Sequence, residues 1–316
     1  MRIEKMANTM KKEGHELIFL GGRPIRGQNL GAFDDAFYLH LPSSFRVVYD
    51  PRVEKQWVKR IGELKPDVVH AHNCTIAKFM LSTEYPTIFD DHEYYSKQSS
   101  RYDVWPFFKR QLVKPMIKRF PIWERQLLER YPTLTSNRNI ANEHRKIGFF
   151  VEPVPNVPTR NQVSNLIEPE ERHGYVYVGN DFNLKRFLPH RDMTGLRDIL
   201  DVDAITGLSH REMMERLMHY EVGLTPWHEH EWHRYSEANK NYEYMHAGMP
   251  VVTNRIIKTH NFPDDPFVYS FNSYDDILDV LAGIPELDRG KIQEHALREY
   301  VWELSEPIIK EAYKRA

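Results

Sequence analysis

The segment YSEANKNYEYMHAGMPVVTN, residues 235–254, is the most informative part of the sequence. Its pattern predicts a loop, then a helix over Ala238–Ala247, then a buried strand over Val251–Thr253. Ser236 is a candidate N-cap and Gly248 a stop signal, because a hydroxyl can bond the first free amides and glycine readily ends a helix. A helix that leads directly into a buried strand is typical of a parallel α/β sheet.

The predicted helix carries groups suited to a phosphorylated ligand. Its N-terminal amides and its dipole can hold a diphosphate. Asn239 and Glu243 are four residues apart and share a helix face, and a carboxylate so placed can accept two hydrogen bonds from a ribose diol. Tyr242 and Met245 lie on other faces and should pack against the domain. The spacing alone fits an ordinary amphipathic helix with one solvated glutamate equally well.

The same alternation of strands and helices extends over the whole chain, which predicts parallel sheets with crossover helices. The expected helices are Met1–Glu13, Pro51–Leu64, Thr75–Leu81, two within Trp105–Arg130 broken near Pro121, Asn139–Lys146 and a pair within Lys291–Arg315. The other expected strands are Glu16–Leu20, Phe45–Tyr49, Val68–Ala71, Thr87–Phe89, Thr133–Thr135, Tyr175–Val178, Val202–Ile205, Val222–Thr225 and Phe267–Tyr269.

A polar stretch with four prolines, Pro153–Gly174, interrupts this alternation and reads as a linker. We therefore predict a first domain over residues 1–155, a linker over 156–173, a second domain over 174–295 and a terminal segment over 296–316. Two doubly wound units in succession predict a central cleft, because open parallel sheets bind ligands beyond the carboxyl ends of their strands.

The bulk composition narrows the class of protein. A chain of 316 residues is longer than a single hydrophobic core usually supports, which favours two domains. Its net charge of -2 provides no positive electrostatic field that would attract nucleic acid. A single cysteine excludes an internal disulfide. No apolar run is long enough for a membrane span, and the charged N-terminus does not look like a signal peptide. We expect a cytoplasmic location, at the inner membrane surface if the chain contacts lipid.

Residues 235–254 resemble the retaining glycosyltransferases of family 4, which have the two-domain GT-B fold. The shared pattern comprises Asn239-Lys240, Glu243-Tyr244-Met245, Gly248 and Pro250-Val251-Val252. The resemblance implies that Glu243 binds the ribose of a nucleotide sugar, and that Asn239 and Lys240 contact its phosphates and sugar. Many members of the family have an acid eight positions earlier, where this chain has Tyr235. Glu237 or Glu231 could take its place.

Six further segments resemble the same family in the same order. They are Arg2–Leu20, Lys65–Asn73, Phe89–Tyr95, Val154–Pro158, Tyr177–Lys185 and Tyr300–Ser305, the last of which resembles the start of a helix that returns to the first domain. The family begins with a strand before its first helix, whereas this sequence starts at the helix. The resemblance therefore implies a GT-B fold whose first domain lacks its usual first strand.

Several residues of the first domain are candidates for the acceptor side. The resemblance implies that His92 faces the donor sugar and the acceptor hydroxyl, where a histidine can orient a hydroxyl or stabilise charge. A hydrogen-bonded loop histidine fits the sequence as well. Glu93 is a neighbouring candidate contact. Because His70 and His72 alternate along a strand, we expect only His72 to face the cleft and His70 to be structural.

The phosphate loop of the second domain supplies the other candidates. Gly179 lets the backbone approach a phosphate closely, and Lys185 could neutralise the leaving diphosphate as the second catalytic group. Asn180 stands near where the family often has an arginine, and Arg186 could supply that charge. We therefore expect Gly179, Asn180 and Arg186 to bind the donor.

The histidine-rich loop over residues 228–233 suggests a zinc site, but its pairs lack the i, i+4 spacing of helical zinc ligands. We predict no metal and no cofactor besides the donor substrate. His228, with Tyr235 and Glu237, is instead a candidate sugar or acceptor contact. The basic segment Phe107–Arg130 could touch anionic lipid, although a solvated helix face explains it more simply.

The sequence thus predicts a glycosyltransferase that moves a sugar from a nucleotide diphosphate to a glycan, lipid-linked or small-molecule acceptor, with retention of configuration and no nucleic-acid partner. Two alternatives stay open. A nucleotide-sugar epimerase of the same architecture would need acids and bases around the sugar C2 that the sequence does not assemble. A non-catalytic nucleotide-sugar-binding protein would fit the absent first strand and Tyr235.

Overall fold

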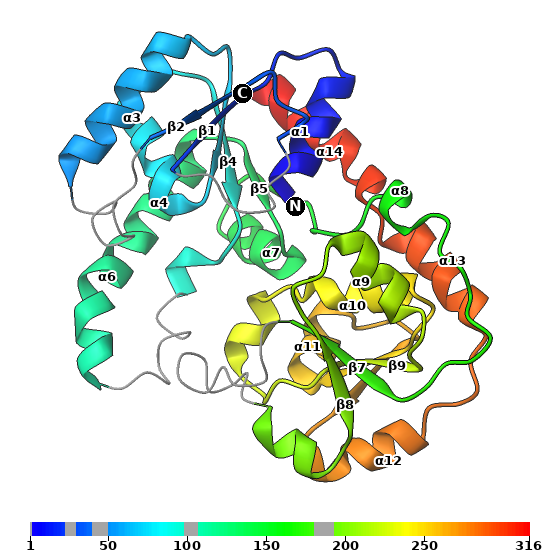
Figure 1. Cartoon of the computed structure of the whole chain (residues 1–316). Helices are drawn as coiled ribbons and strands as arrows, with labels where there is room; N and C mark the ends of the chain where they lie inside the picture. Colours follow the sequence, from blue (N-terminus) through cyan, green and yellow to red (C-terminus); the bar gives the residue numbers. More distant parts are fainter. Residues whose placement is uncertain (1, 23–29, 40–49, 98–106, 180–192) are drawn as a thin grey trace. The chain divides into compact units, whose positions relative to one another are not determined.

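The computed structural model describes residues 2–22, 30–39, 50–97, 107–179 and 193–316 (Figure 1). Contacts divide the chain into two compact units. Unit 1 comprises Met1–Ser99, Phe107–Pro155 and Ser305–Ala316, and unit 2 comprises Ser100–Pro106 and Asn156–Leu304. The terminal helix therefore belongs to unit 1 although it follows unit 2 in sequence.

Unit 2 is built on one parallel sheet of five strands in the order β11-β10-β9-β7-β8. The strands are β7 (Tyr175–Val178), β8 (Val202–Ile205), β9 (Val222–Thr225), β10 (Val251–Asn254) and β11 (Val268–Phe271). The helices and 3-10 turns around it are α8 (Arg160–Val163), η5 (Thr194–Asp198), α9 (His210–Leu217), η6 (Glu231–Tyr235), α10 (Asn239–His246), α11 (Arg255–Asn261), η7 (Tyr274–Asp276), α12 (Ile277–Ala282), α13 (Arg289–Glu299) and η8 (Trp302–Leu304).

The order in which the chain adds strands to the unit 2 sheet reverses between β7 and β9. Strand β8 lies on one side of β7, and β9 to β11 lie on the other. Such a switch point opens a crevice at the carboxyl ends of the two central strands, and α/β sheets bind ligands there. The topology therefore directs attention to Gly179 and to the loop after Thr225.

Unit 1 contains two parallel sheets. The larger has the order β3-β4-β5-β6, with β3 (Val69–His72), β4 (Thr87–Asp91), β5 (Thr133–Thr135) and β6 (Val151–Pro153). The smaller pairs β1 (Ile18–Gly21) with β2 (Asp35–Tyr38), and within the described residues neither strand bonds the larger sheet. Among the described strands, unit 1 is thus built on two separate sheets.

The helical elements of unit 1 are α1 (Arg2–Lys12), α3 (Pro51–Leu64), α4 (Cys74–Ala77), η1 (Lys78–Ser82), η2 (Tyr95–Lys97), α6 (Phe107–Arg130), α7 (Arg138–Lys146) and α14 (Glu306–Arg315). Helix α14 packs on α1, and two ion pairs, Lys12–Glu306 at 2.7 Å and Lys310–Glu13 at 2.7 Å, join the two ends of the chain. Among the described helices, none combines the length and the apolar character that a membrane crossing requires.

Most predicted elements are confirmed, but α6 corrects the expected break near Pro121. A single helix runs from Phe107 to Arg130 with Pro115 and Pro121 inside it. Phe120 and Leu127 are buried in the same core cluster, on either side of Pro121. Packing of this face outweighs the local cost of the proline, which is about 3 kcal/mol in a helix interior.

Two further expectations differ from the structure. Helix α10 has Ala238 as its N-cap, with no side-chain hydrogen bond, so Ser236 is not the cap. Strands β2 and β6 have no counterpart among the predicted elements. Both are short, and β2 shows little alternation of apolar and polar residues. The predicted strand Phe45–Tyr49 lies outside the described residues.

Helix α10 is fixed to the unit 2 sheet by Tyr244. Its hydroxyl donates to the Leu224 carbonyl at 3.0 Å and accepts from the Val178 amide at 2.8 Å, so it bonds both central strands. Its ring fills the space above Gly223, where a Cβ atom would lie 2.1 Å from the Tyr244 Cγ. Glycine at residue 223 is therefore a requirement for seating α10 over the switch point.

Replacing Gly223 with alanine should lower the free energy of unfolding of unit 2 by about 2 kcal/mol or more. The added methyl group would collide with the Cβ atom and the nearest ring carbons of Tyr244, which cannot move away. Urea denaturation measures the loss. The matched control is Gly62→Ala in α3, where the new Cβ meets only the Tyr85 hydroxyl at 3.9 Å. That variant should be stabilised by about 0.5 kcal/mol. Equal stability of Gly223→Ala and the parent would contradict the packing described.

Candidate functional site

The crevice at the unit 2 switch point brings a lysine between two aromatic rings. Lys240, in the first turn of α10, has its Nζ 3.9 Å from the ring centroid of Tyr177 and 5.1 Å from that of Trp227. Tyr177 lies on β7 and Trp227 follows β9, so the two central strands supply the walls. Cation–π contacts of this kind hold an ammonium group in place without neutralising its charge.

Gly179, the residue after β7, lies next to this ammonium group. A Cβ atom at Gly179 would be 2.6 Å from the Tyr177 hydroxyl and 3.0 Å from the Lys240 Nζ. A side chain at this position would collide with the Tyr177 hydroxyl and crowd the Lys240 ammonium, so the packing of these two residues requires glycine here. The other residues predicted in this loop, Asn180, Lys185 and Arg186, lie outside the described residues.

The N-terminus of α10 is the second feature of the crevice. Its N-cap, Ala238, offers no side-chain acceptor to the first turn. Asn241 is turned inward, where its Oδ1 accepts a hydrogen bond of 2.5 Å from the Thr225 hydroxyl. Asn239 and Lys240 are half-buried at the start of the helix. A helix start of this kind presents amide groups and a positive dipole end to an anion.

Glu243 lies one turn further along α10 and stays accessible. Its side chain is 15% exposed, and its Oε1 lies 3.5 Å from the Nε2 of His210 at the start of α9. Because α9 and α10 both begin at the carboxyl edge of the sheet, the carboxylate lies at the same edge as Gly179 and Lys240. The structure thus brings together three of the residues predicted to bind a donor.

The remaining predicted residues of unit 2 are more scattered. Tyr235 ends η6 and contacts Trp232, with ring centroids 6.3 Å apart. Glu237 accepts a hydrogen bond from the Tyr242 hydroxyl. His228 is exposed and lies beside Tyr274. The sugar and acceptor contacts expected of these three residues stay predictions.

The predicted histidines of unit 1 meet around a buried carboxylate, Asp90, at the end of β4. Its Oδ2 lies 3.1 Å from the His72 Nδ1, 3.2 Å from the His92 Nε2 and 3.6 Å from the His70 Nε2. The fourth neighbour is Arg2, whose Nε and Nη2 donate to Asp90 at 3.0 and 2.8 Å. Arg2 also donates to the Val154 carbonyl.

This arrangement corrects the expectation that His70 and His72 face opposite ways. His70 and His72 are two residues apart and therefore lie on the same face of β3, where their rings stack with centroids 4.5 Å apart. His70 is fixed by the Tyr313 hydroxyl at 2.9 Å. The acid that contacts His92 is Asp90, because the pleat turns Asp91 to the opposite face. Glu93 is half-buried next to His92.

The charges of this cluster follow from burial and pairing. Burial alone would raise the pKa of Asp90, but Arg2 and the histidines hold it well below its ordinary value. Burial, with the nearby His70, lowers the pKa of His72 to about 3, so this imidazole is neutral at pH 7. His92 is the most accessible of the three histidines, with 24% of its side chain exposed. A histidine held by a buried carboxylate can orient a hydroxyl or accept its proton.

Sequence reasoning missed five residues of these two clusters. Tyr177 and Trp227 belong to a strand and a loop with no sign of a cation contact, and His210 is more than 30 positions from Glu243. Arg2 gives no local signal because its partner is 88 residues away. For Asp90 a signal existed, since an acid inside a buried parallel strand needs a compensating charge.

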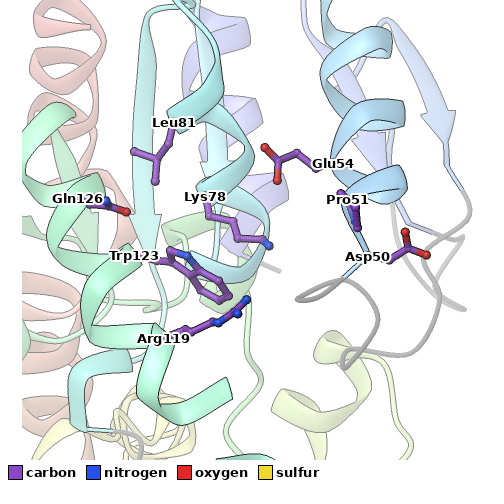
Figure 2. Close-up of a pocket in the computed structure, with 8 residues that line it drawn as sticks. All are labelled: Asp50, Pro51, Glu54, Lys78, Leu81, Arg119, Trp123 and Gln126. Atoms are coloured by element: carbon purple, nitrogen blue, oxygen red, sulfur yellow. The ribbon is translucent and has the colours of Figure 1, made fainter. Parts of the chain in front are cut away.

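Unit 1 also has a pocket of about 340 Å³ between α3, η1 and α6 (Figure 2). Lys78 and Arg119 project into it opposite Asp50 and Glu54, and the Lys78 Nζ lies 4.5 Å from the ring centroid of Trp123. Burial lowers the pKa of Lys78. The lining thus carries both signs of charge and could hold a polar ligand, but it contains none of the predicted site residues.

Comparison with solved structures identifies the fold. No protein-family model matches the sequence, and no curated protein matches it significantly. Among the similar structures is sucrose-phosphate synthase (tll1590) from Thermosynechococcus elongatus, with TM-score 0.69, 10% identity and coverage of 99% of this chain and 92% of that one. WaaG, a glycosyltransferase involved in lipopolysaccharide biosynthesis, has TM-score 0.66, 16% identity and coverage of 97% and 94%.

A third structure is described as trehalose-6-phosphate from E. coli bound with UDP-2-fluoro glucose, with TM-score 0.65, 10% identity and coverage of 98% and 95%. The likeness extends over nearly the full length of this chain. At identities this low it is evidence of the fold alone. The chain therefore has the GT-B glycosyltransferase fold, which confirms the expected fold class.

Removing the charge of Arg2 should destabilise unit 1 in a pH-dependent way. Arg2→Gln leaves a buried carboxylate without its main cation, which costs about 3 kcal/mol or more at pH 7. In the parent, the lowered pKa of Asp90 contributes stability above the ordinary carboxyl pKa that is lost as pH falls. In the variant, burial favours protonation of Asp90, so the deficit should shrink as pH falls from 7 to 5. Urea denaturation of the parent and the variant at several pH values measures this difference in the free energy of unfolding.

The double variant Arg2→Gln/Asp90→Asn is the control for this prediction. Removing both charges should restore part of the stability lost in Arg2→Gln and abolish its pH dependence, because no buried charge remains unpaired. A double variant that loses as much stability as the sum of the two single variants would show that the ion pair is not what couples these residues.

Proposed function

We propose that the protein is a retaining glycosyltransferase that uses a nucleotide diphosphate sugar. The observation that carries the proposal is the crevice of unit 2, where the Lys240 ammonium, the start of α10 and the Glu243 carboxylate lie at the carboxyl edge of the sheet. Each group suits one part of such a donor, and the order of the groups along α10 follows the order of those parts. The fold of glycosyltransferases supports the same activity.

The donor's diphosphate would lie against the first amides of α10 and the Lys240 ammonium, next to Gly179. Two cationic features at one point favour an anion over a neutral sugar. Glu243 would accept hydrogen bonds from the ribose diol, one helical turn away. The similar structure that contains UDP-2-fluoro glucose supports a donor of this class.

Catalysis would depend mainly on stabilising the leaving diphosphate and positioning the acceptor. We assign the first task to Lys240 with Lys185 and Arg186, and donor contacts to Asn180 and Asn239. His92, held by Asp90, would orient the acceptor hydroxyl, with His72 and Glu93 as neighbouring contacts. In a reaction with retention, the acceptor attacks from the face that the diphosphate leaves, so the enzyme needs no carboxylate pair like that of glycosidases.

The acceptor would be a glycan, a lipid-linked saccharide or a small molecule. A lipid-linked acceptor would bring unit 1 close to a membrane, and α6 offers exposed basic residues for anionic lipid there, among them Lys114, Lys118 and Arg125. His228, Tyr235 and Glu237 remain proposed sugar or acceptor contacts. The proposed location is the cytoplasm or the inner membrane surface.

Replacing Glu243 with glutamine should weaken the binding of nucleoside diphosphates and their sugars by about 10-fold or more, because a carboxylate that accepts two diol hydrogen bonds is worth about 1.5–3 kcal/mol. Titration calorimetry with UDP, GDP and ADP and their glucose or mannose derivatives measures the affinity. The control is Glu294→Gln, an exposed glutamate on α13 of the same unit. Unchanged affinity in Glu243→Gln would remove the donor site from this helix.

Replacing His92 with asparagine should slow donor turnover by about 100-fold or more while leaving donor affinity unchanged, since general acid–base or orienting groups contribute about 10²–10⁴. Release of nucleoside diphosphate, with water or an added sugar as acceptor, measures turnover, and the anomer formed tests retention. A sugar isomerised without transfer would favour an epimerase. Tight binding without turnover across a panel of acceptors would favour a binding protein.

A further inference from the structure

A second group of buried ionisable side chains lies in unit 1, on the face of β4 opposite to Asp90. It consists of Asp91 at the end of β4, Glu124 on α6 and His144 on α7. All three are at most 2% exposed. One polar atom from each lies within 4.8 Å of those of the other two, and the His144 Nε2 is 3.9 Å from the Asp91 Oδ2.

The hydrogen bonding of this group is incomplete. Within the described part of the chain, both carboxylate oxygens of Asp91 and both ring nitrogens of His144 lack a hydrogen-bond partner. The hydroxyl of Thr135, whose residue pairs with Asp91 across β4 and β5, also lacks one. Buried polar atoms without a partner are rare, and a group of five in one place calls for a ligand that they share.

Glu124 is held toward this space from the other side. Its Oε1 accepts from the Tyr95 amide at 2.7 Å and its Oε2 from the Ser96 amide at 3.0 Å. The Ser96 hydroxyl also donates to Oε2, and these bonds from the start of η2 fix the carboxylate in the interior. Among the described residues, Oε1 accepts only the Tyr95 bond and keeps a further lone pair that is available to the group.

Burying these three ionisable side chains without a ligand costs free energy. Burial, together with the negative charge of Asp90, raises the pKa of Asp91 well above its ordinary value. Burial, together with Asp91, raises the pKa of Glu124 to about 8. Burial also lowers the pKa of His144, so the imidazole is neutral and its ring nitrogen can bind a metal ion. A divalent cation would offset the charge of both carboxylates at once.

We propose that Asp91, Glu124 and His144 bind a divalent transition-metal ion, of which zinc fits best, in the interior of unit 1. Metal–ligand bonds of about 2.0–2.2 Å place neighbouring ligand atoms about 3–4 Å apart. The 3.9 Å between the His144 Nε2 and the Asp91 Oδ2 falls in this range, and all three ligand atoms lie within 4.8 Å of one another. Thr135 is placed to donate to a ligand oxygen or to a fourth ligand such as water. The ion would link β4, α6 and α7, three elements of one unit.

The donor set decides between metals. Two carboxylates and one imidazole suit zinc, whose sites combine His nitrogen with Asp and Glu oxygen at four-coordinate geometry. Calcium requires six to eight oxygen ligands, and magnesium keeps several waters, which a site with no exposed ligand accommodates poorly. Because all three ligands are buried in the interior of unit 1, the role of the ion is structural, and it does not depend on the proposed transfer reaction.

Metal analysis of the full chain tests this site directly. The protein is purified without a histidine tag from zinc-supplemented medium, passed through a desalting column and analysed by mass spectrometry for metals. The parent should carry about one zinc per chain, and Asp91→Asn and His144→Gln should lose most of it. Removal of zinc by a chelator should lower the Tm by about 5 °C or more, and added zinc should restore it.

The chain has 16 histidines, so adventitious zinc needs a control. His219→Gln, an exposed histidine of unit 2, should keep the parental zinc content and Tm. If the parent holds no stoichiometric zinc and zinc does not raise its Tm, the site does not exist. Retention of parental zinc by both Asp91→Asn and His144→Gln, each shown by circular dichroism to be folded, would equally overturn it.

Discussion

The pleat of strand β4 sets the internal chemistry of unit 1. Asp90 and Asp91 end this strand, and because consecutive side chains point to opposite faces, each carboxylate is buried on its own side of the sheet. A buried carboxylate is tolerated only with a cation, a proton or a set of donors. Both faces of the sheet must therefore supply partners, and the helices that carry those partners have defined positions as a result.

The partners on the two faces are of different kinds. On one face, Asp90 is neutralised by Arg2 of α1, and the histidines of β3 complete its shell. On the other, Asp91 faces a second acid, Glu124, and a neutral imidazole. The first face thus carries a completed ion pair next to an accessible histidine, which is a suitable support for chemistry. The second face carries polar groups that need a further ligand.

The elements best predicted from the sequence are those whose residue pattern lies within the element itself. Strands β7, β8 and β9 of unit 2 match their predicted bounds because each is a short apolar run between turn residues. The cap of α10 and the continuity of α6 depend on packing, which overrides local preference at Ser236 and Pro121. The residues of α10 that we propose for donor binding could be named from the sequence because they lie within one segment. The pairing of Arg2 with Asp90 could not, since nothing in either segment specifies the other.

In unit 2, the fold determines where a ligand can bind, and the local side chains determine which ligand fits. A five-stranded parallel sheet with a switch point serves many ligands, so the topology gives only the position of the crevice. In the proposed function, an anionic nucleotide is selected by the local chemistry, in which Tyr177 and Trp227 hold the Lys240 ammonium beside Gly179. Tyr244 holds this arrangement in place, because its hydroxyl bonds both central strands. Tyr244, which fixes the backbone of α10, directly follows Glu243. The packing that seats the helix therefore also positions the carboxylate that we propose as the ribose contact.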